Sequence, residues 1–220
     1  MIGPNTTEEY GRALVTILDA RRSIRVFTDE LPPKECIEEI IAAGLLAPYA
    51  AQAVGEDLDF RRFFVISKSS PRLKEVAEIA RARAGTLSEQ LQSQMAASPY
   101  LRERAAGFSK RLELFARRGV LGIGTAPYYI VVAERKGVPP VEQQSLAHCL
   151  QNMWLMATAL GLGFHLVSAT AQMADDPDFC EVLGIRPDEF ELNGCAIGYP
   201  KTIPPRMPRP AANDVTTWIE

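Results

Sequence analysis

The chain contains few of the residues that would point to metal, disulfide or membrane chemistry. Its 220 residues include only 4 cysteines and 2 histidines, and no two cysteines have the C-x-x-C spacing of a structural zinc site. No apolar run approaches the roughly 18 residues of a membrane span, and none follows Met1 as in a signal peptide. The net charge of −3 gives no global attraction to nucleic acid or to an anionic membrane. These absences predict a cytoplasmic protein without metal, nucleic-acid partner or membrane association.

The composition is that of a globular chain with enough apolar material for a sizeable core. Hydrophobic residues make up 47% of the sequence and charged residues 23%. Helix-like and strand-like patterns alternate, without repeats, Gly/Ser linkers or low-complexity segments. We therefore predict one α+β (α/β-like) domain over residues 1–220, with a Pro/Arg-rich tail from about residue 200.

Apolar periodicity and turn residues define the expected elements. Helices are expected over Thr6–Asp19, Pro32–Leu46, Pro71–Ala84, Glu142–Leu160 and Pro177–Leu183. One or two further helices are expected within Leu87–Arg118, with a break at Pro99. Strands are expected where β-branched and aromatic residues cluster, over Phe60–Ser67, Tyr128–Ala133, Phe164–Val167 and Gly194–Gly198. The run Gly122–Pro127 is expected to be a turn, because it lacks the third glycine of a dinucleotide-binding loop.

The segment Glu142–Leu160 is the most apolar of the expected helices. Leu150, Met153, Trp154 and Met156 cover more than one face of it, which is typical of a helix buried centrally or in a subunit interface. A lone domain of this size would struggle to cover these side chains together, and exposed apolar patches mark interfaces. We therefore predict a homodimer formed through this helix.

A short basic segment is the most informative stretch of the chain. It reads Arg21-Arg22-Ser23-Ile24-Arg25 and is followed by Val26-Phe27. In an extended conformation Arg21, Ser23 and Arg25 would share one side, with Ile24 packed on the other. Arginine offers a planar fork of donors suited to phosphate, and serine adds a hydroxyl donor. On the local sequence two interpretations stay open: a site for a phosphate or phosphorylated cofactor, and an ordinary basic surface strand.

The order of several motifs resembles the nitroreductase family of FMN-dependent oxidoreductases. Each motif is weak alone, but together they cover the chain from about Ile17 to Pro210. They are the basic segment, Leu31-Pro32-Pro33 with the helix ending at Ala47-Pro48, Ala159-Leu160-Gly161-Leu162-Gly163, Cys195-Ala196-Ile197-Gly198-Tyr199-Pro200, and the tail Pro204-Pro205-Arg206-Met207-Pro208-Arg209-Pro210. The resemblance implies a nitroreductase-like fold, in which a mixed β-sheet is flanked by helices. It also implies dimerisation through a long central helix, with FMN at the subunit interface.

The resemblance also implies a set of cofactor-binding residues. Arg21, Arg22, Ser23 and Arg25 stand where family members contact the phosphate, the ribityl chain and the ring edge of FMN. Two arginines of the tail stand where the family closes on the phosphate, and two residues after the strand Phe164–Val167 align with the loop against the flavin ring. These four are Arg206, Arg209, Ser168 and Ala169. No residue is singled out as a catalytic acid or base, because the flavin carries the reactive atom.

The chain departs from the family pattern after Pro48. Relatives usually read Ala-Pro-Ser-x-x-Asn-x-Gln-Pro-Trp, and here Gln52 falls at the Asn position, where it can offer the same amide chemistry. The Gln-Pro-Trp element is replaced by Val54-Gly55-Glu56. Because this segment lines the mouth of the active site in the family, substrate preference stays open.

The resemblance implies electron or hydride transfer from NAD(P)H through flavin N5 to a nitroaromatic, quinone or related small-molecule acceptor. Two alternatives remain. One is a specialised member, such as an ene-type or dehalogenating reductase or a flavin-fragmenting enzyme. The other is a flavin-binding protein without turnover, since a fold does not determine a function.

The remaining polar residues favour structural interpretations. His148 and His165 are expected to pack or to form hydrogen bonds, and Cys149 and Cys195 to be small buried side chains. The remaining expectation concerns arginines of the Leu87–Arg118 region, which are predicted to lie on solvated helix faces: Arg102, Arg104, Arg117 and Arg118.

Overall fold

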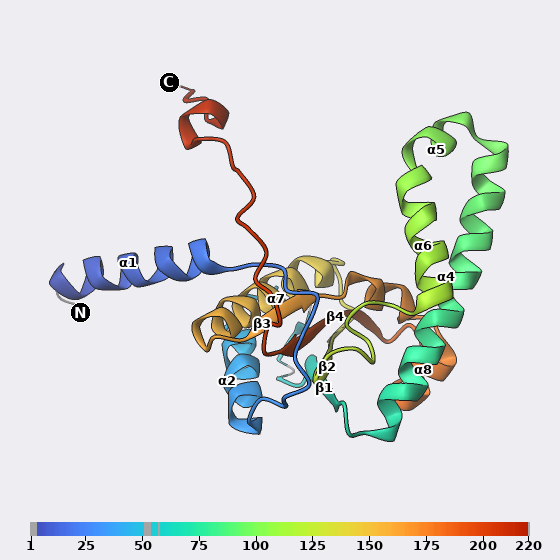
Figure 1. Ribbon diagram of the computed structural model, residues 1–220, viewed down its shortest axis with the longest axis horizontal. Helices are drawn as coiled ribbons and strands as arrows, with labels where there is room; N and C mark the ends of the chain where they lie inside the picture. The colour runs from blue at the N-terminus through green and yellow to red at the C-terminus, as the bar shows by residue number, and fades with distance from the viewer. Residues whose placement is uncertain (1–3, 51–53, 57, 220) are drawn as a thin grey trace.

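The computed structural model describes residues 4–50, 54–56 and 58–219, and Figure 1 shows their arrangement. A central sheet lies between two groups of helices. The helices are α1 (Pro4–Ala20), α2 (Lys34–Leu45), α4 (Pro71–Ala97), α5 (Pro99–Arg104), α6 (Ala106–Arg118), α7 (Glu142–Ala159) and α8 (Pro177–Leu183), with short 3₁₀ turns η1 (Ser168–Met173) and η2 (Ala212–Val215). The strands are β1 (Arg61–Ser67), β2 (Tyr128–Arg135), β3 (Gly163–Leu166) and β4 (Phe190–Gly198).

The four strands form one sheet in the order β1-β2-β4-β3, and every neighbouring pair is antiparallel. A mixed sheet was predicted, but among the described residues the parallel pairing is limited to a single bridge between Ser23 and Phe164. This bridge adds the basic segment to the free side of β3, so the segment lies at one edge of the sheet.

Alternating side chains of β2 supply two separate cores, one on each face of the sheet. Tyr129, Val131 and Ala133 belong to the core beneath α4 and α8. The intervening residues Tyr128, Ile130 and Val132 belong to the core beneath α2 and α7. Because both faces of the strand are covered, its residues Tyr128–Ala133 form a continuous apolar run rather than an alternating one.

A buried ion pair joins the first two strands under α2. Both side chains of Arg61 and Glu134 are 2% exposed, and the guanidinium donates to one Glu134 carboxylate oxygen at 2.9 and 3.1 Å. Arg61 also donates to the carbonyl oxygen of Gly44 at 3.3 Å, in the last turn of α2. Burial raises the pKa of Glu134, although Arg61 and Ser145 oppose that shift. The pair therefore links β1, β2 and the end of α2 away from water.

The helical region between β1 and β2 differs in part from the sequence prediction. The helix expected to end at Ala84 continues to Ala97 as α4. The predicted break is confirmed, since Ser98 caps α5 and Pro99 is its first residue. Figure 1 shows that α4, α5 and α6 form a hairpin that extends away from the sheet. Arg102 is exposed, as predicted, but its guanidinium donates to the carbonyl oxygen of Ala96 at 3.1 Å.

The central helix α7 is covered more completely by its own chain than the sequence suggested. Met153 is fully buried and Leu150 is 2% exposed, while Trp154 and Met156 pack against the same core. One chain therefore covers Leu150 and Met153 fully, with α2 and the sheet as partners, whereas Trp154 and Met156 stay half-buried. The large exposed apolar side chains lie elsewhere. They include Tyr10, Leu14, Val15 and Leu18 on α1 and Ile203, Met207, Val215, Trp218 and Ile219 in the tail.

Three smaller predictions concern two cysteines, a turn and membrane spans. Cys149 and Cys195 are both fully buried and unpaired, and burial raises the pKa of each thiol, as expected for inert core side chains. Gly122 and Gly124 adopt positive φ values of 96° and 78° in the turn before β2, which confirms the turn. Among the helices of the part of the chain that the structure describes, none has the length and hydropathy to cross a bilayer.

Candidate functional site

The basic segment follows α1 directly and is seated on β3. The backbone N–H of Ile24 donates to the carbonyl oxygen of Phe164 at 3.0 Å, beside the bridge from Ser23. Ile24 is 5% exposed, whereas Arg25 is exposed, so the predicted division between a packed and an open side holds at these two residues. A Cβ at Gly163 would come within 2.7 Å of the Ile24 side chain. The glycine therefore allows the segment to approach β3 closely.

Trp154 of α7 makes contact with both arginines that open the segment. The guanidinium carbon of Arg21 lies 4.4 Å from the centre of the Trp154 ring. The indole Nε1 donates to the carbonyl oxygen of Arg22 at 3.1 Å. The ring also stacks on Phe164, at 5.0 Å between centroids. Sequence reasoning missed these contacts, since Trp154 is more than a hundred residues away and was read only as an apolar side chain.

The charges of the basic segment are incompletely balanced by the chain itself. Arg22 donates to the carbonyl oxygens of Asp19 and Arg21, at 2.5 and 2.9 Å, but its Nε is buried without a hydrogen-bond partner in the described chain. Within residues 4–50, 54–56 and 58–219, no carboxylate pairs with Arg21, Arg22 or Arg25. A cluster of cations with free donors fits an anion such as a phosphate group, and this is the chemistry that FMN would bring.

The loop after β3 lies at the end toward which the basic segment runs. Because Ser23 pairs with Phe164 in parallel, the segment and β3 advance in the same direction. Arg25 is accordingly close enough to His165 to influence its titration. Ser168 and Ala169 follow immediately in η1, where Ser168 is exposed and Ala169 packs against the core under α4. The structure thus brings the two predicted regions to one edge of the sheet.

The C-terminal tail passes the same region. The backbone N–H of Thr28 donates to the carbonyl oxygen of Tyr199 at 2.9 Å, and Lys201 N donates to that of Val26 at 3.0 Å. Further out, Arg206 pairs with Asp19 at 2.5 Å, at the end of α1. Arg206 therefore lies near the basic segment, and its predicted contact with a phosphate stays a prediction. Arg209 is exposed and has no ion pair with another described residue.

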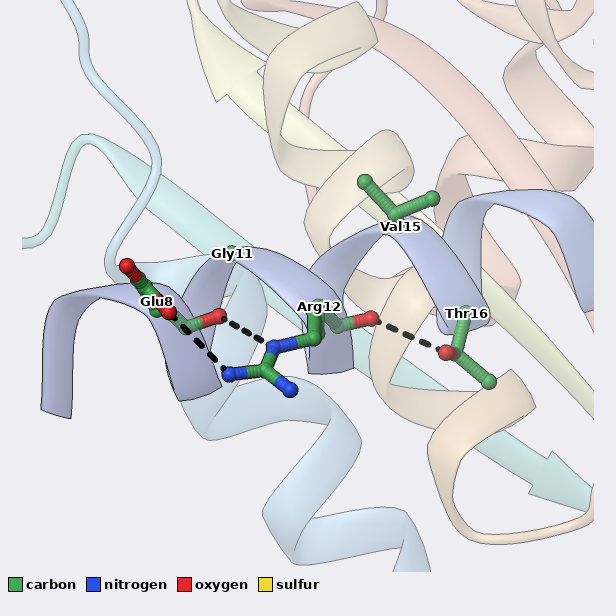
Figure 2. Close-up of a pocket in the computed structure, with 5 residues that line it drawn as sticks. All are labelled: Glu8, Gly11, Arg12, Val15 and Thr16. Atoms are coloured by element: carbon green, nitrogen blue, oxygen red, sulfur yellow. Dashed lines mark hydrogen bonds and ion pairs between the residues drawn. The ribbon is translucent and has the colours of Figure 1, made fainter. Parts of the chain in front are cut away.

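Two further features bear on the limits of the site. Gln52 lies outside the described residues, so its predicted place at the mouth stays a prediction. A shallow hollow is lined only by residues of α1, and Figure 2 shows them: Glu8, Gly11, Arg12, Val15 and Thr16. Arg12 is ion-paired to Glu8 at 3.3 Å, and Thr16 donates to the carbonyl oxygen of Arg12 at 2.9 Å. Because these polar groups bond to one another on one helix, the hollow does not resemble a cofactor site.

The half-buried His165 is expected to make stability depend on pH. Burial, with a smaller contribution from the Arg25 charge, lowers the pKa of His165 from 6.5 to about 4. As the pH falls, the unfolded chain therefore binds a proton at this histidine before the folded chain does. The contribution of neutral His165 to the free energy of unfolding is fully present above pH 6.5 and is lost as the pH falls toward 4. Allowing for partial exposure, the loss should be about 2 kcal/mol. Urea denaturation of His165→Gln between pH 7 and 4.5 should show a smaller decline than wild type, and the exposed-site control His148→Gln should not. Equal declines in all three proteins would contradict this.

Comparison with known proteins identifies the family. The chain belongs to the nitroreductase family, because the family model named Nitroreductase family matches residues 18–199. This membership confirms the predicted family and the predicted oxidoreductase class. No curated protein matches the sequence.

Solved structures share the fold at low sequence identity. A nitroreductase with bound FMN from Bacteroides fragilis has a TM-score of 0.67 and 21% identity, covering 94% of this chain and 98% of that one. The FMN- and NADPH-dependent nitroreductase NfnB from Sphigopyxis sp. strain HMH, solved as a mutant, has a TM-score of 0.64 and 20% identity, covering 93% and 98%. The NADPH:FMN oxidoreductase from Vibrio harveyi, complexed with NAD+, has a TM-score of 0.59 and 19% identity, covering 94% and 77%. The predicted nitroreductase-like fold is confirmed.

Proposed function

We propose that the chain is an FMN-dependent oxidoreductase that passes electrons from NAD(P)H, through flavin N5, to a nitroaromatic, quinone or related acceptor. The observation that carries the proposal is the basic segment, whose cations are held at the edge of the sheet without a carboxylate partner in the described chain. Family membership supports the redox class. Fold relatives with bound FMN or NAD+ support the cofactor and the electron donor.

The basic segment and the tail divide the work of binding the cofactor. Arg21, Arg22 and Ser23 would donate to the phosphate, where the buried Nε of Arg22 would gain an acceptor. Arg206 and Arg209 would close on the same anion from the tail. Charge-assisted bonds from arginine forks are the strongest ordinary contacts to phosphate, so these residues would supply most of the selectivity for FMN.

The other end of the segment would face the flavin ring. Arg25 would place a positive charge at the polar edge of the ring, and Ser168 and Ala169 would lie along it. Gln52 is assigned to the ring edge by its place in the sequence alone. FMN, when bound, supplies reversible hydride and electron transfer at N5. A fixed arginine charge beside the ring favours the reduced, more negative state of the cofactor.

The proposed activity is tested by anaerobic reduction. Purified protein is incubated with FMN, mixed with NADH or NADPH, and followed by the visible flavin band. Bleaching by either nucleotide, and its reversal by nitrofurazone or menadione, is the expected result. Reversal only by an activated alkene would favour a specialised reductase. Bound FMN that neither nucleotide bleaches would contradict the proposal and favour a flavin-binding protein without turnover.

A homodimer is part of the proposal, with a surface that the structure suggests. Leu14 and Leu18 are 49% and 47% exposed on α1, and Figure 1 shows α1 and the tail extending from the body on the same side as each other. Val15, which lines the hollow shown in Figure 2, is also exposed on this helix. Several exposed large apolar side chains on one helix are typical of a protein interface. A second copy that covered α1 would also lie beside the basic segment.

Charged substitutions on α1 are expected to dissociate the dimer. The double variant Leu14→Asp, Leu18→Asp would bury two carboxylates in the proposed interface, where each carries a desolvation penalty of several kcal/mol. Light scattering should give about twice 24.2 kDa for wild type and 24.2 kDa for the variant. Val65→Asp, at an exposed apolar residue of the opposite edge strand, serves as the control and should stay dimeric. A wild-type monomer at micromolar concentration would refute the assembly.

A further inference from the structure

The indole of Trp154 has a combination of partners that simple core packing does not require. One ring contacts the guanidinium of Arg21, the main-chain carbonyl of Arg22 and the ring of Phe164. Phe164 in turn accepts the hydrogen bond from Ile24. The helix α7, the strand β3 and the basic segment therefore meet at this side chain.

The indole hydrogen bond fixes the backbone of the basic segment. The bond of 3.1 Å from Nε1 to the Arg22 carbonyl oxygen holds the segment at its first turn after α1. The bond of 3.0 Å from Ile24 N to Phe164 holds it two residues later. With both points fixed, the backbone that carries Arg22 and Ser23 has little freedom to move away from the edge of the sheet.

The face of the Trp154 ring holds the Arg21 side chain without neutralising its charge. A carboxylate partner would occupy the donor fork of Arg21, whereas a ring attracts the cation by its face and leaves the edge of the guanidinium free to donate. An arginine side chain loses about 2 kcal/mol of rotamer entropy when it is ordered. Holding Arg21 over Trp154 before the anion arrives removes part of that cost from binding.

The support itself is rigid. Phe164 is 1% exposed, and the Trp154 and Phe164 rings stack at an angle of 18° between their planes. Trp154 also packs against the core between α2, α7 and the sheet, which contains Met153 and Ala157. A ring that stacks on the buried Phe164 and packs against this core can serve as a fixed reference for the flexible arginines.

From these contacts we infer that Trp154 is a positioning residue for phosphate recognition, acting through Arg21 and Arg22. The inference rests on the proposed function, because the anion is the phosphate of FMN. It assigns the ring a role beyond core packing: it determines how strongly the chain distinguishes FMN from riboflavin, which has the same ring and ribityl chain but no phosphate.

The ratio of the riboflavin and FMN dissociation constants measures this role. Both ligands are titrated by fluorescence quenching into full-length apoprotein at fixed salt. In Trp154→Leu, which loses the ring and the indole donor, the ratio should fall about 10- to 30-fold, while riboflavin affinity changes little. In Trp154→Phe, which keeps a ring face but loses the donor, it should fall about 3- to 10-fold. Trp154→Phe also decides the outcome if the leucine variant does not fold.

Phe63→Leu provides the matched control. Phe63 packs against the same core from β1, at the opposite edge of the sheet from β3, on which the basic segment is seated. Its substitution should leave the ratio unchanged. A double-mutant cycle adds a second readout: Trp154→Leu combined with Arg21→Ala should lower the ratio by less than the product of the two single effects.

The possible outcomes separate cleanly. A lowered ratio in the Trp154 variants, with the control unchanged, supports the inference. Equal weakening of FMN and riboflavin would show that Trp154 is only a packing residue and would overturn it, as would an unchanged FMN affinity or full additivity with Arg21→Ala. Failure of the wild-type protein to prefer FMN over riboflavin is a different result, which refutes the phosphate site of the proposed function.

Discussion

Replacing Arg61 with alanine is expected to lower the free energy of unfolding by about 3–5 kcal/mol, because a buried carboxylate would lose its cation. The Arg61 and Glu134 side chains are each 2% exposed, and burial raises the pKa of Glu134 even with Arg61 present. Without Arg61 that pKa would rise further, and the carbonyl oxygen of Gly44 would lose a donor. Chemical denaturation at pH 7 measures the change.

The neighbouring residue supplies the control for this prediction. Arg62 pairs with Asp59 at 3.1 Å, but these side chains are 40% and 64% exposed, so Arg62→Ala should cost no more than about 1 kcal/mol. Replacing both members of the buried pair, as Arg61→Met with Glu134→Leu, should recover much of the loss, because no charge is then left buried. Comparable losses for Arg61→Ala and Arg62→Ala would contradict this account of the pair.

Arg21→Ala is expected to have the largest effect on cofactor binding. It removes a charge-assisted donor to the phosphate, and such bonds contribute about 1.5–3 kcal/mol each, or about 10- to 150-fold in FMN affinity. Folding should survive, because Arg21 has no ion pair among the described residues and only its ring contact with Trp154 is lost. Fluorescence titration with FMN at fixed salt measures the effect, since salt screens exposed phosphate contacts.

Arg111→Ala is the matched control for that titration. Arg111 is an exposed arginine on α6, in the hairpin that extends away from the sheet, so its loss removes the same charge far from the basic segment. Arg102 is less suitable, because it donates to carbonyl oxygens at the end of α4. An Arg21→Ala protein that binds FMN as tightly as Arg111→Ala and wild type would show that the basic segment is only a surface strand.

The elements that the sequence predicted well are those with a strong local pattern. The strand predicted over Tyr128–Ala133 is a continuous apolar run, because both faces of this part of β2 are buried. Helix α8 occupies Pro177–Leu183, as predicted from its proline and apolar spacing. Helix ends within the polar region were less certain. Leu87 and its neighbours carry few apolar residues to show which face is packed, so the pattern did not reveal that α4 continues without a break.

Contacts between distant segments could not be read from local pattern. Nothing near Arg61 in the sequence distinguishes it from Arg62, so its burial beside Glu134 could not be predicted from the local pattern. Trp154 was recognised as apolar, but the residues it contacts were fixed by tertiary packing. The coverage of α7 was misjudged for a related reason: its partners in α2 are remote in sequence, and their combined area is not visible in the helix itself.

The candidate site was predicted in composition but not in assembly. Arg21, Arg22, Ser23 and Arg25 came from the motif order, and the structure adds how they are held on β3. The ion pair between Arg206 and Asp19 holds the C-terminal tail near the basic segment. The role of each residue toward FMN stays a proposal.

The comparison of FMN with riboflavin on the wild-type protein tests the central claim most directly. The two ligands differ by the phosphate alone, and the claim is that the basic segment binds that phosphate. At low, fixed salt we expect FMN to bind at least about 100-fold more tightly, equivalent to two charge-assisted bonds, and the difference to shrink as salt is raised. Equal dissociation constants at every salt concentration, or no binding of either flavin at micromolar protein, would contradict the account.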